Sequence, residues 1–78
     1  MEMRIRLTTM EQVKEFVAIA GKCDFDIDIS YNRVVIDAKS ILGILSMDLS
    51  QPLTVTCNGE CSDFLEQIEK FAVQDAVA

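Results

Sequence analysis

The feature that most constrains the fold of this chain is a series of four short segments with the pattern of β-strands. In the first of them, Met3, Ile5 and Leu7 alternate with arginines. Alternation with a period of two is typical of a strand that buries one face. The same reasoning predicts strands at residues 24–29 and 53–57, and a strand at residues 33–37 that forms a hairpin after the break at Tyr31 and Asn32.

Between these strands, apolar residues recur at the three- and four-residue steps of helices. The first such stripe predicts a helix from Thr9 to Gly21, with Thr8 or Thr9 opening a capping box and Gly21 as a candidate left-handed cap. The last predicts a helix from Cys61 or Ser62 to Gln74, with Ser62 as a candidate cap.

The segment from Ser40 to Met47 is too short and too apolar for a free-standing helix, so it must dock on the rest of the chain. Ser40 is well placed to cap it. Four short strands and amphipathic helices in 78 residues imply one α+β domain over residues 1–78. We expect a two-layer sandwich with an antiparallel or mixed sheet, covered by helices on one face and wet on the other.

The charge excludes several classes of partner. The chain has 13 acidic and 7 basic residues, a net charge of −6, which argues against nucleic acid and anionic membranes as partners. No apolar run approaches the roughly 20 residues that span a bilayer, and the amino terminus lacks the features of a signal peptide. We therefore expect a soluble, cytoplasmic protein.

The three cysteines are Cys23, Cys57 and Cys61. An odd number without a secretory signal predicts reduced thiols in a cytosol rather than disulfides. A zinc site is disfavoured, because the chain has no histidine and no fourth cysteine. A position near a helix start would favour the thiolate of Cys61.

Three alternating aspartates at residues 24–28 invite a calcium-loop interpretation. An EF-hand loop needs glycine at its sixth position and glutamate at its twelfth, but counting from Asp24 gives Ile29 and Val35. The simpler interpretation is a strand with an acidic, solvated face. There is also no glycine-rich phosphate loop and no nucleophile beside a base, so we expect neither an enzyme nor a bound cofactor or metal.

The run Lys-Ser-Ile-Leu-Gly-Ile-Leu-Ser-Met at residues 39–47, in this order of elements, resembles HPr, the small phosphocarrier of the bacterial sugar phosphotransferase system. The resemblance extends from about Phe16 to Phe71. It implies the HPr-like open-faced sandwich, in the order β-α-β-β-α-β-α, with a four-stranded antiparallel sheet covered on one face by helices.

The resemblance also implies a site that this chain lacks. HPr proteins carry a phosphorylated histidine, followed by an arginine and a proline, between the first strand and the first helix. Here the segment from Leu7 to Gln12 passes directly from strand to helix, and all three residues are missing. Glu11 stands where a positive charge would be wanted, so we expect neither histidine phosphotransfer nor phosphorylation of Glu11.

A second phosphorylation position of the family, in low-GC Gram-positive bacteria, is the serine of the Lys-Ser-Ile motif, which an ATP-dependent kinase modifies to control carbon catabolite repression. Ser40 matches it. Members without the histidine keep this serine and act as corepressor partners. The residues that match Ile41, Leu42 and Leu45 belong to the family's partner-docking surface, to which we add Met47, while Ile44 is expected in the core. The other possibility is that Ser40 only caps the helix.

We therefore expect a non-catalytic regulatory or protein-binding module related to the phosphotransferase system. Its candidate partners are HPr kinase, a transcriptional regulator or a component of that system. One alternative is a phosphocarrier that accepts phosphate at a residue other than histidine, and another is a purely structural assembly domain. Two departures from the family bear on recognition: Asp48 replaces a usual glycine, and Gln51-Pro52 replaces a lysine-glycine turn.

Overall fold

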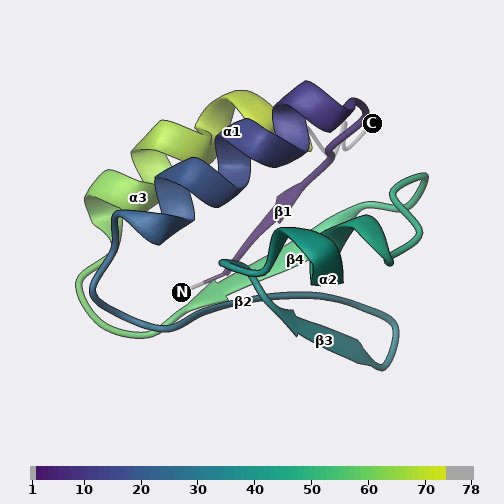
Figure 1. Cartoon of the computed structure of the whole chain (residues 1–78). Helices are drawn as coiled ribbons and strands as arrows, with labels where there is room; N and C mark the ends of the chain where they lie inside the picture. Colours follow the sequence, from purple (N-terminus) through teal and green to yellow (C-terminus); the bar gives the residue numbers. More distant parts are fainter. Residues whose placement is uncertain (1, 74–78) are drawn as a thin grey trace, which may run out of the picture.

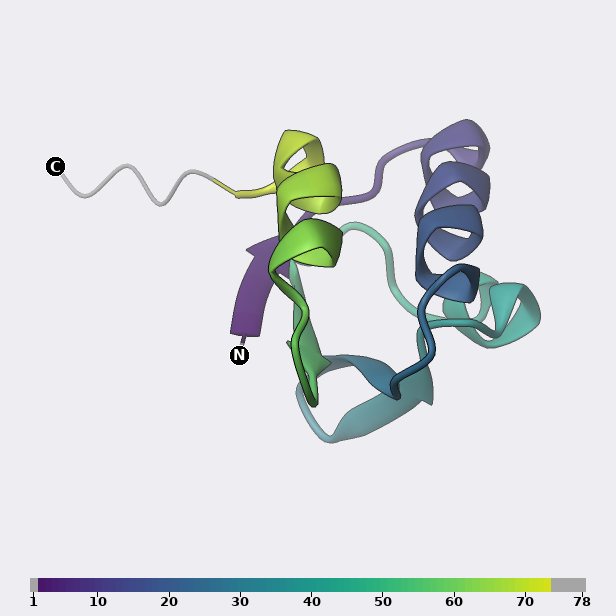
Figure 2. The same ribbon diagram turned by 90° about the vertical axis from the view of Figure 1, so that its left-hand side faces the viewer.

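The computed structural model describes residues 2–73 and shows two layers, with helices packed on one face of a single sheet (Figures 1 and 2). This α+β architecture confirms the predicted fold class. The strands are β1 (Glu2–Ile5), β2 (Ile27–Tyr31), β3 (Val34–Asp37) and β4 (Leu53–Cys57). The helices are α1 (Met10–Gly21), α2 (Ile41–Leu45) and α3 (Ser62–Ile68), and the 3₁₀ turn η1 (Glu69–Phe71) follows α3.

The sheet is antiparallel throughout, in the order β1-β4-β2-β3. Val55 in β4 lies opposite Met3 on one side and Ile29 on the other. Buried and half-exposed residues alternate along β4, as expected for a strand with one covered face. The sheet face away from the helices carries polar side chains such as Thr54 and Thr56.

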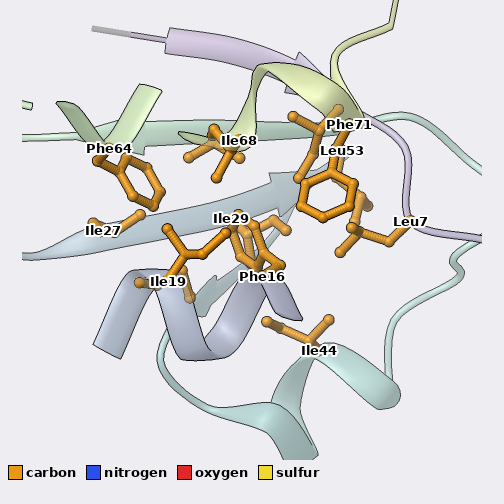
Figure 3. Close-up of a cluster of buried hydrophobic side chains, with 14 of the residues drawn as sticks. Leu7, Phe16, Ile19, Ile27, Ile29, Ile44, Leu53, Phe64, Ile68 and Phe71 are labelled. Atoms are coloured by element: carbon orange, nitrogen blue, oxygen red, sulfur yellow. The ribbon is translucent and has the colours of Figure 1, made fainter. Parts of the chain in front are cut away.

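The core lies between the sheet and the helices (Figure 3). The Phe16 ring of α1 meets the Phe64 ring of α3 edge-to-face, with centroids 6.2 Å apart. Ile44 of α2 is fully buried in the same cluster. All three helices thus contribute to one core, which a domain of this size requires because it has little other surface to bury.

The start of α1 follows one of the two expected capping boxes. Thr9 Oγ1 accepts a hydrogen bond of 3.1 Å from the backbone N–H of Gln12. The side-chain oxygen of Gln12 returns to Thr8, whose backbone N–H and hydroxyl donate to it at 2.7 and 3.0 Å. The first turn of α1 is therefore capped by its own side chains.

Replacing Thr9 by alanine should lower the free energy of unfolding by about 1 kcal/mol, because a first-turn N–H loses its acceptor. Urea unfolding followed by far-UV circular dichroism measures this loss. Thr9→Ser, which keeps the hydroxyl, is the matched control and should stay close to the native protein. Equal losses in the two variants would contradict the capping role.

Several expected boundaries are wrong. Gly21 does not form a left-handed cap: it is the last residue of α1, the C-cap Lys22 has a right-handed backbone, and the one positive-φ glycine of residues 2–73 is Gly59. Ser62 does not cap α3 but is its first residue, and the N-cap residue Cys61 makes no side-chain capping hydrogen bond. The α-helix ends at Ile68, and the expected end at Gln74 lies outside the described residues.

The second strand begins at Ile27 instead of Asp24. Phe25 comes before the strand and faces the helices, where its ring packs edge-to-face on Phe64 with a centroid distance of 6.3 Å. Asp24 and Asp26 consequently lie before the strand, and only Asp28 belongs to it. Within residues 2–73, no helix is long and apolar enough to cross a membrane.

Candidate functional site

Ser40 stands at the start of α2 and organises this short helix. Its hydroxyl oxygen accepts a hydrogen bond of 3.2 Å from the N–H of Gly43, and its own N–H donates to the carbonyl of Asp37 at 3.0 Å. Ser46 closes the other end by donating its hydroxyl hydrogen to the Gly43 carbonyl at 2.6 Å. The expected capping role of Ser40 is thereby confirmed, and its side chain is exposed to solvent.

The apolar side chains of α2 divide between core and surface. Ile44 is fully buried, whereas Leu42 is 79% exposed and has the largest exposed fraction among the large apolar residues described. Ile41 and Leu45 are half-buried and pack against the edge of the core. The outer face of α2 thus consists of Ser40, Leu42 and parts of Ile41 and Leu45, and we call this set the α2 surface.

Met47 does not belong to the α2 surface. It is only 6% exposed and lies in the core cluster, so the expectation that it contacts a partner is wrong. Its N–H donates to the carbonyl of Ile44 at 3.0 Å, which continues the helical turn. A residue three positions after a buried one lies on the same helix face, and this places Met47 beside Ile44.

Gly43 allows α2 to lie close to β3. A Cβ at this position would be 2.6 Å from the Cγ2 methyl of Ile36 and 3.1 Å from Ser40 Oγ. The methyl contact is closer than carbon atoms allow, so any larger residue would push the helix outward. A glycine inside a helical pattern is the signal that could have indicated this close contact from the sequence.

The charged residues before and after α2 are held by local hydrogen bonds. The Asp37 carboxylate accepts a hydrogen bond of 2.8 Å from the N–H of Lys39. The Lys39 ammonium reaches away to the carbonyl of Cys23, also at 2.8 Å. After α2, the hydroxyl and N–H of Ser50 donate to the Asp48 carboxylate, and these hydrogen bonds hold the pKa of Asp48 below its ordinary value.

The connection between β1 and α1, where the resemblance places a phosphorylated histidine, is short and internally bonded. The N–H of Arg6 donates to the carbonyl of Phe71 at 2.9 Å, and Leu7 is buried. The next two residues are Thr8 and Thr9, whose side chains serve the cap of α1. Glu11 is exposed in the first turn, so this connection contains no imidazole and presents a carboxylate instead.

The family model for the HPr component of the phosphotransferase system, described as its phosphorylation site, matches residues 10–74. The chain belongs to the HPr family. The match begins at Met10, the first residue of α1, and includes Ser40 with the whole of α2. Family membership relates the chain to the phosphocarriers of the phosphotransferase system and to proteins that act through protein partners.

Two solved HPr structures have the same fold. HPr-C-His from Thermoanaerobacter tengcongensis has a TM-score of 0.77 at 22% identity, over 90% of this chain and 88% of that one. The phosphocarrier protein HPr from Bacillus anthracis str. Ames has a TM-score of 0.71 at 24% identity, over 94% of this chain and 96% of that one. The HPr-like open-faced sandwich expected from the sequence is therefore confirmed.

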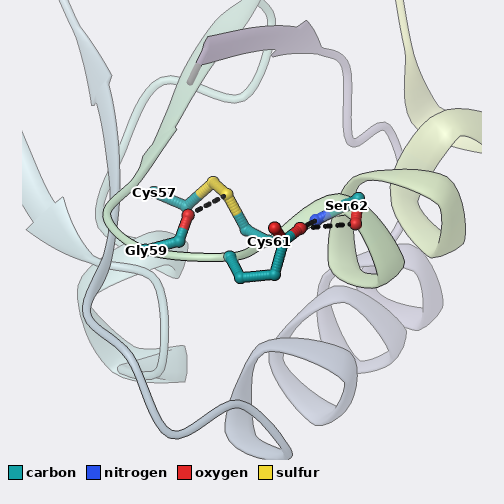
Figure 4. Close-up of a disulfide and its surroundings, with 5 residues drawn as sticks. Cys57, Gly59, Cys61 and Ser62 are labelled. Atoms are coloured by element: carbon teal, nitrogen blue, oxygen red, sulfur yellow. Dashed lines mark hydrogen bonds between the residues drawn. A yellow bond between two sulfur atoms is a disulfide. The ribbon is translucent and has the colours of Figure 1, made fainter.

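This HPr-family chain contains a disulfide that the sequence did not predict. Cys57 ends β4, Cys61 precedes α3, and their sulfurs are bonded (Figure 4). Their Cα atoms lie 6.6 Å apart across the turn at Gly59, within the span of about 4.4–6.8 Å that disulfides allow. The expectation of reduced thiols is wrong for this pair, and Cys61 presents no thiolate. Cys23 has a free, half-buried thiol.

A shallow hollow lies between the end of α1 and the start of α3. Its lining includes the carboxylates of Asp24, Glu60 and Asp63 together with the ammonium of Lys22. The Ser62 hydroxyl and N–H donate to Glu60 and hold the pKa of that carboxyl below its ordinary value. The excess of negative charge makes the hollow unsuited to a phosphate group. Among residues 2–73, no three acidic, cysteine or histidine side chains are grouped to hold a metal ion.

Proposed function

We propose that this chain is a regulatory, protein-binding member of the HPr family whose partner docks on the α2 surface and is controlled by phosphorylation of Ser40. The observation that carries the proposal is the exposed serine beside the 79% exposed Leu42, on a helix that is held to the core through other residues. An exposed apolar side chain on a rigid helix is a typical anchor for a protein partner.

The absence of histidine separates this function from that of a histidine phosphocarrier. These 78 residues contain none, and no other side chain has an unperturbed pKa near neutral with a nitrogen able to accept and release a phosphoryl group. The connection before α1 supports the same view, because the Gln12 N–H already donates to Thr9 and the Thr8 N–H and hydroxyl already donate to the Gln12 side chain. A charge change at Ser40 needs no imidazole.

The physical effect of a phosphate on Ser40 follows from its surroundings. It would add about −1.5 to −2 charges. The start of a helix favours that charge, while the neighbouring Asp37 carboxylate opposes it. Both terms act at an exposed position, where water and salt weaken them. Phosphorylation should therefore change the stability of the fold little. It should change the charge of the α2 surface strongly, as a regulatory switch requires.

The test compares two phosphate donors. The protein is incubated with ATP and HPr kinase, and separately with phosphoenolpyruvate and the first enzyme of the phosphotransferase system. Mass spectrometry then maps any added phosphate. We expect phosphate on Ser40 in the first reaction, and none in the second because the chain offers no histidine.

Ser40→Ala should abolish the labelling, whereas Ser46→Ala, which removes a hydroxyl at the other end of the same helix, should not. Leu42→Ala should slow the labelling without loss of the folded circular dichroism signal, because it removes part of the docking surface. Phosphate only in the phosphoenolpyruvate reaction would indicate a carrier that uses another residue. No phosphate in either reaction would favour the structural assembly domain.

A further inference from the structure

The two edges of the sheet differ in how they are covered. Along β1, the segment after η1 closes the edge: the N–H of Val73 donates to the carbonyl of Arg4 at 2.9 Å, and Ala72 bridges to Ile5. At the opposite edge, β3 pairs only with β2 among the strands of residues 2–73 (Figure 1). The outer side of β3 is the uncovered edge.

This uncovered edge is apolar. Val34 is 41% exposed and Val35 is 64% exposed. Val35 lies opposite Ser30, on the sheet face where the neighbouring strands carry polar residues. Natural proteins usually protect such edges, because an exposed strand with apolar side chains offers a template for another strand.

The backbone of β3 is oriented for such pairing. The N–H of Ala38 donates to the carbonyl of Ile27 at 2.9 Å, so position 38 faces β2. Antiparallel ladders alternate between residues that bond to the neighbouring strand and residues that do not. Ile36 and Val34 therefore bond to β2, and the N–H and C=O of Val35 and the N–H of Asp37 point to the open side, while the Asp37 carbonyl accepts from the N–H of Ser40.

The charges along this edge are self-complementary. Arg33 precedes β3, Asp37 ends it, and Val35 lies midway between them. In an antiparallel pair of two identical copies with Val35 opposite Val35, Arg33 of each copy stands opposite Asp37 of the other. One oxygen of Asp37 accepts from the N–H of Lys39, which leaves the second carboxylate oxygen for this ion pair.

We infer that β3 is a self-association edge, on which a second copy of this chain pairs antiparallel about a two-fold axis at Val35. Other registers that keep the same outward groups bonded lose both ion pairs: a shift of two residues places Arg33 or Asp37 opposite Val35, and a shift of four places Arg33 opposite Arg33 or Asp37 opposite Asp37. Like charges directly opposite each other are destabilising in sheets. The favoured occupant is thus a second copy in one register, joining two sheets into one of eight strands.

Sedimentation equilibrium between about 10 µM and 1 mM tests this, since a short edge contact between chains of charge −6 is expected to be weak. The native protein should show a monomer–dimer equilibrium. Val35→Lys places two ammonium groups together at the axis and should raise the dissociation constant at least about tenfold. Met10→Lys, the same kind of change at an exposed apolar position at the start of α1, should leave the constant unchanged.

The register is tested by charge reversal. Arg33→Asp and Asp37→Arg should each abolish self-association, because each places like charges opposite one another. An equimolar mixture of the two variants restores both opposite pairs and should form a heterodimer with about the native affinity. Circular dichroism identifies a variant that has lost its fold. If a charge-reversed variant is unfolded, the dissociation constant of Val35→Lys is the test of self-association.

Three results would overturn the inference. The first is a native protein that stays monomeric at about 1 mM, which would leave the edge to a strand of another protein. The second is a Val35→Lys variant that dimerises as well as the native chain. The third is a mixture of folded charge-reversed variants that stays monomeric.

Discussion

Phe16→Ala should lower the free energy of unfolding by about 3–5 kcal/mol, the usual cost of removing a buried phenylalanine. Phe16 is fully buried and its ring meets the Phe64 ring, so it joins α1 to α3 and both helices to the sheet. A domain of this size has a total stability of only about 4–12 kcal/mol. The substitution should therefore remove much of it, measured by urea unfolding followed by circular dichroism.

Phe25→Ala is the matched control. The ring of Phe25 also packs edge-to-face on Phe64, but Phe25 is only half-buried. Water can fill much of the space that its removal leaves, so the loss should be clearly smaller. If the two variants lost the same stability, the cost could not come from a closed cavity at Phe16, and the central role of that ring would be contradicted.

Reduction of the disulfide between Cys57 and Cys61 should lower stability by about 2 kcal/mol, the chain-entropy estimate for so short a loop. The bond also fixes Cys61, the N-cap residue of α3, whose side chain makes no capping hydrogen bond to the first turn. Phe64 stands one turn further along this helix and is buried. Loosening the start of α3 should thus weaken the packing of Phe64. Urea unfolding with and without a reductant measures the loss.

A variant with both Cys57→Ala and Cys61→Ala should show no response to the reductant, whereas Cys23→Ser should respond like the native chain. Titration of the denatured, unreduced protein should find a single thiol, that of Cys23. Three thiols under those conditions, or equal stability of the native chain with and without reductant, would show that the pair is not bonded in solution.

Much of the fold could be predicted from the sequence, because it depends on short-range patterns. The strand at Leu53–Cys57 was predicted at its observed bounds, since its alternation coincides with alternating burial. The cap of α1 by Thr9 and that of α2 by Ser40 were also predicted, because a capping hydrogen bond involves residues three positions apart. Neither depends on the rest of the chain.

The errors have long-range or geometric causes. The alternation that begins at Asp24 predicts a strand, but β2 begins only at Ile27, and Phe25 before it packs on Phe64, 39 positions away. The odd number of cysteines predicted free thiols, but the turn at Gly59 brings two of them within bonding distance. The number of cysteines carries no information about how close they lie.

The candidate site shows the same division. Ser40 and Leu42 were predicted to lie on the surface of the short helix, and both are exposed. Met47 was assigned to that surface because the whole segment is apolar, and a pattern with apolar residues on nearly every face cannot indicate which face is buried. The direction from which α2 docks on the core determines that Met47 lies on the buried face.

By itself, the sequence determined the order of the elements, the α+β class, the caps of α1 and α2, and the absence of a histidine, because each depends on residue identity or on neighbours within one helical turn. The tertiary structure alone decided that Met47 is buried, that Cys57 and Cys61 are bonded, and that β1 is covered while the edge of β3 is open. These features depend on distances between segments far apart in the chain, which the packing of the core sets.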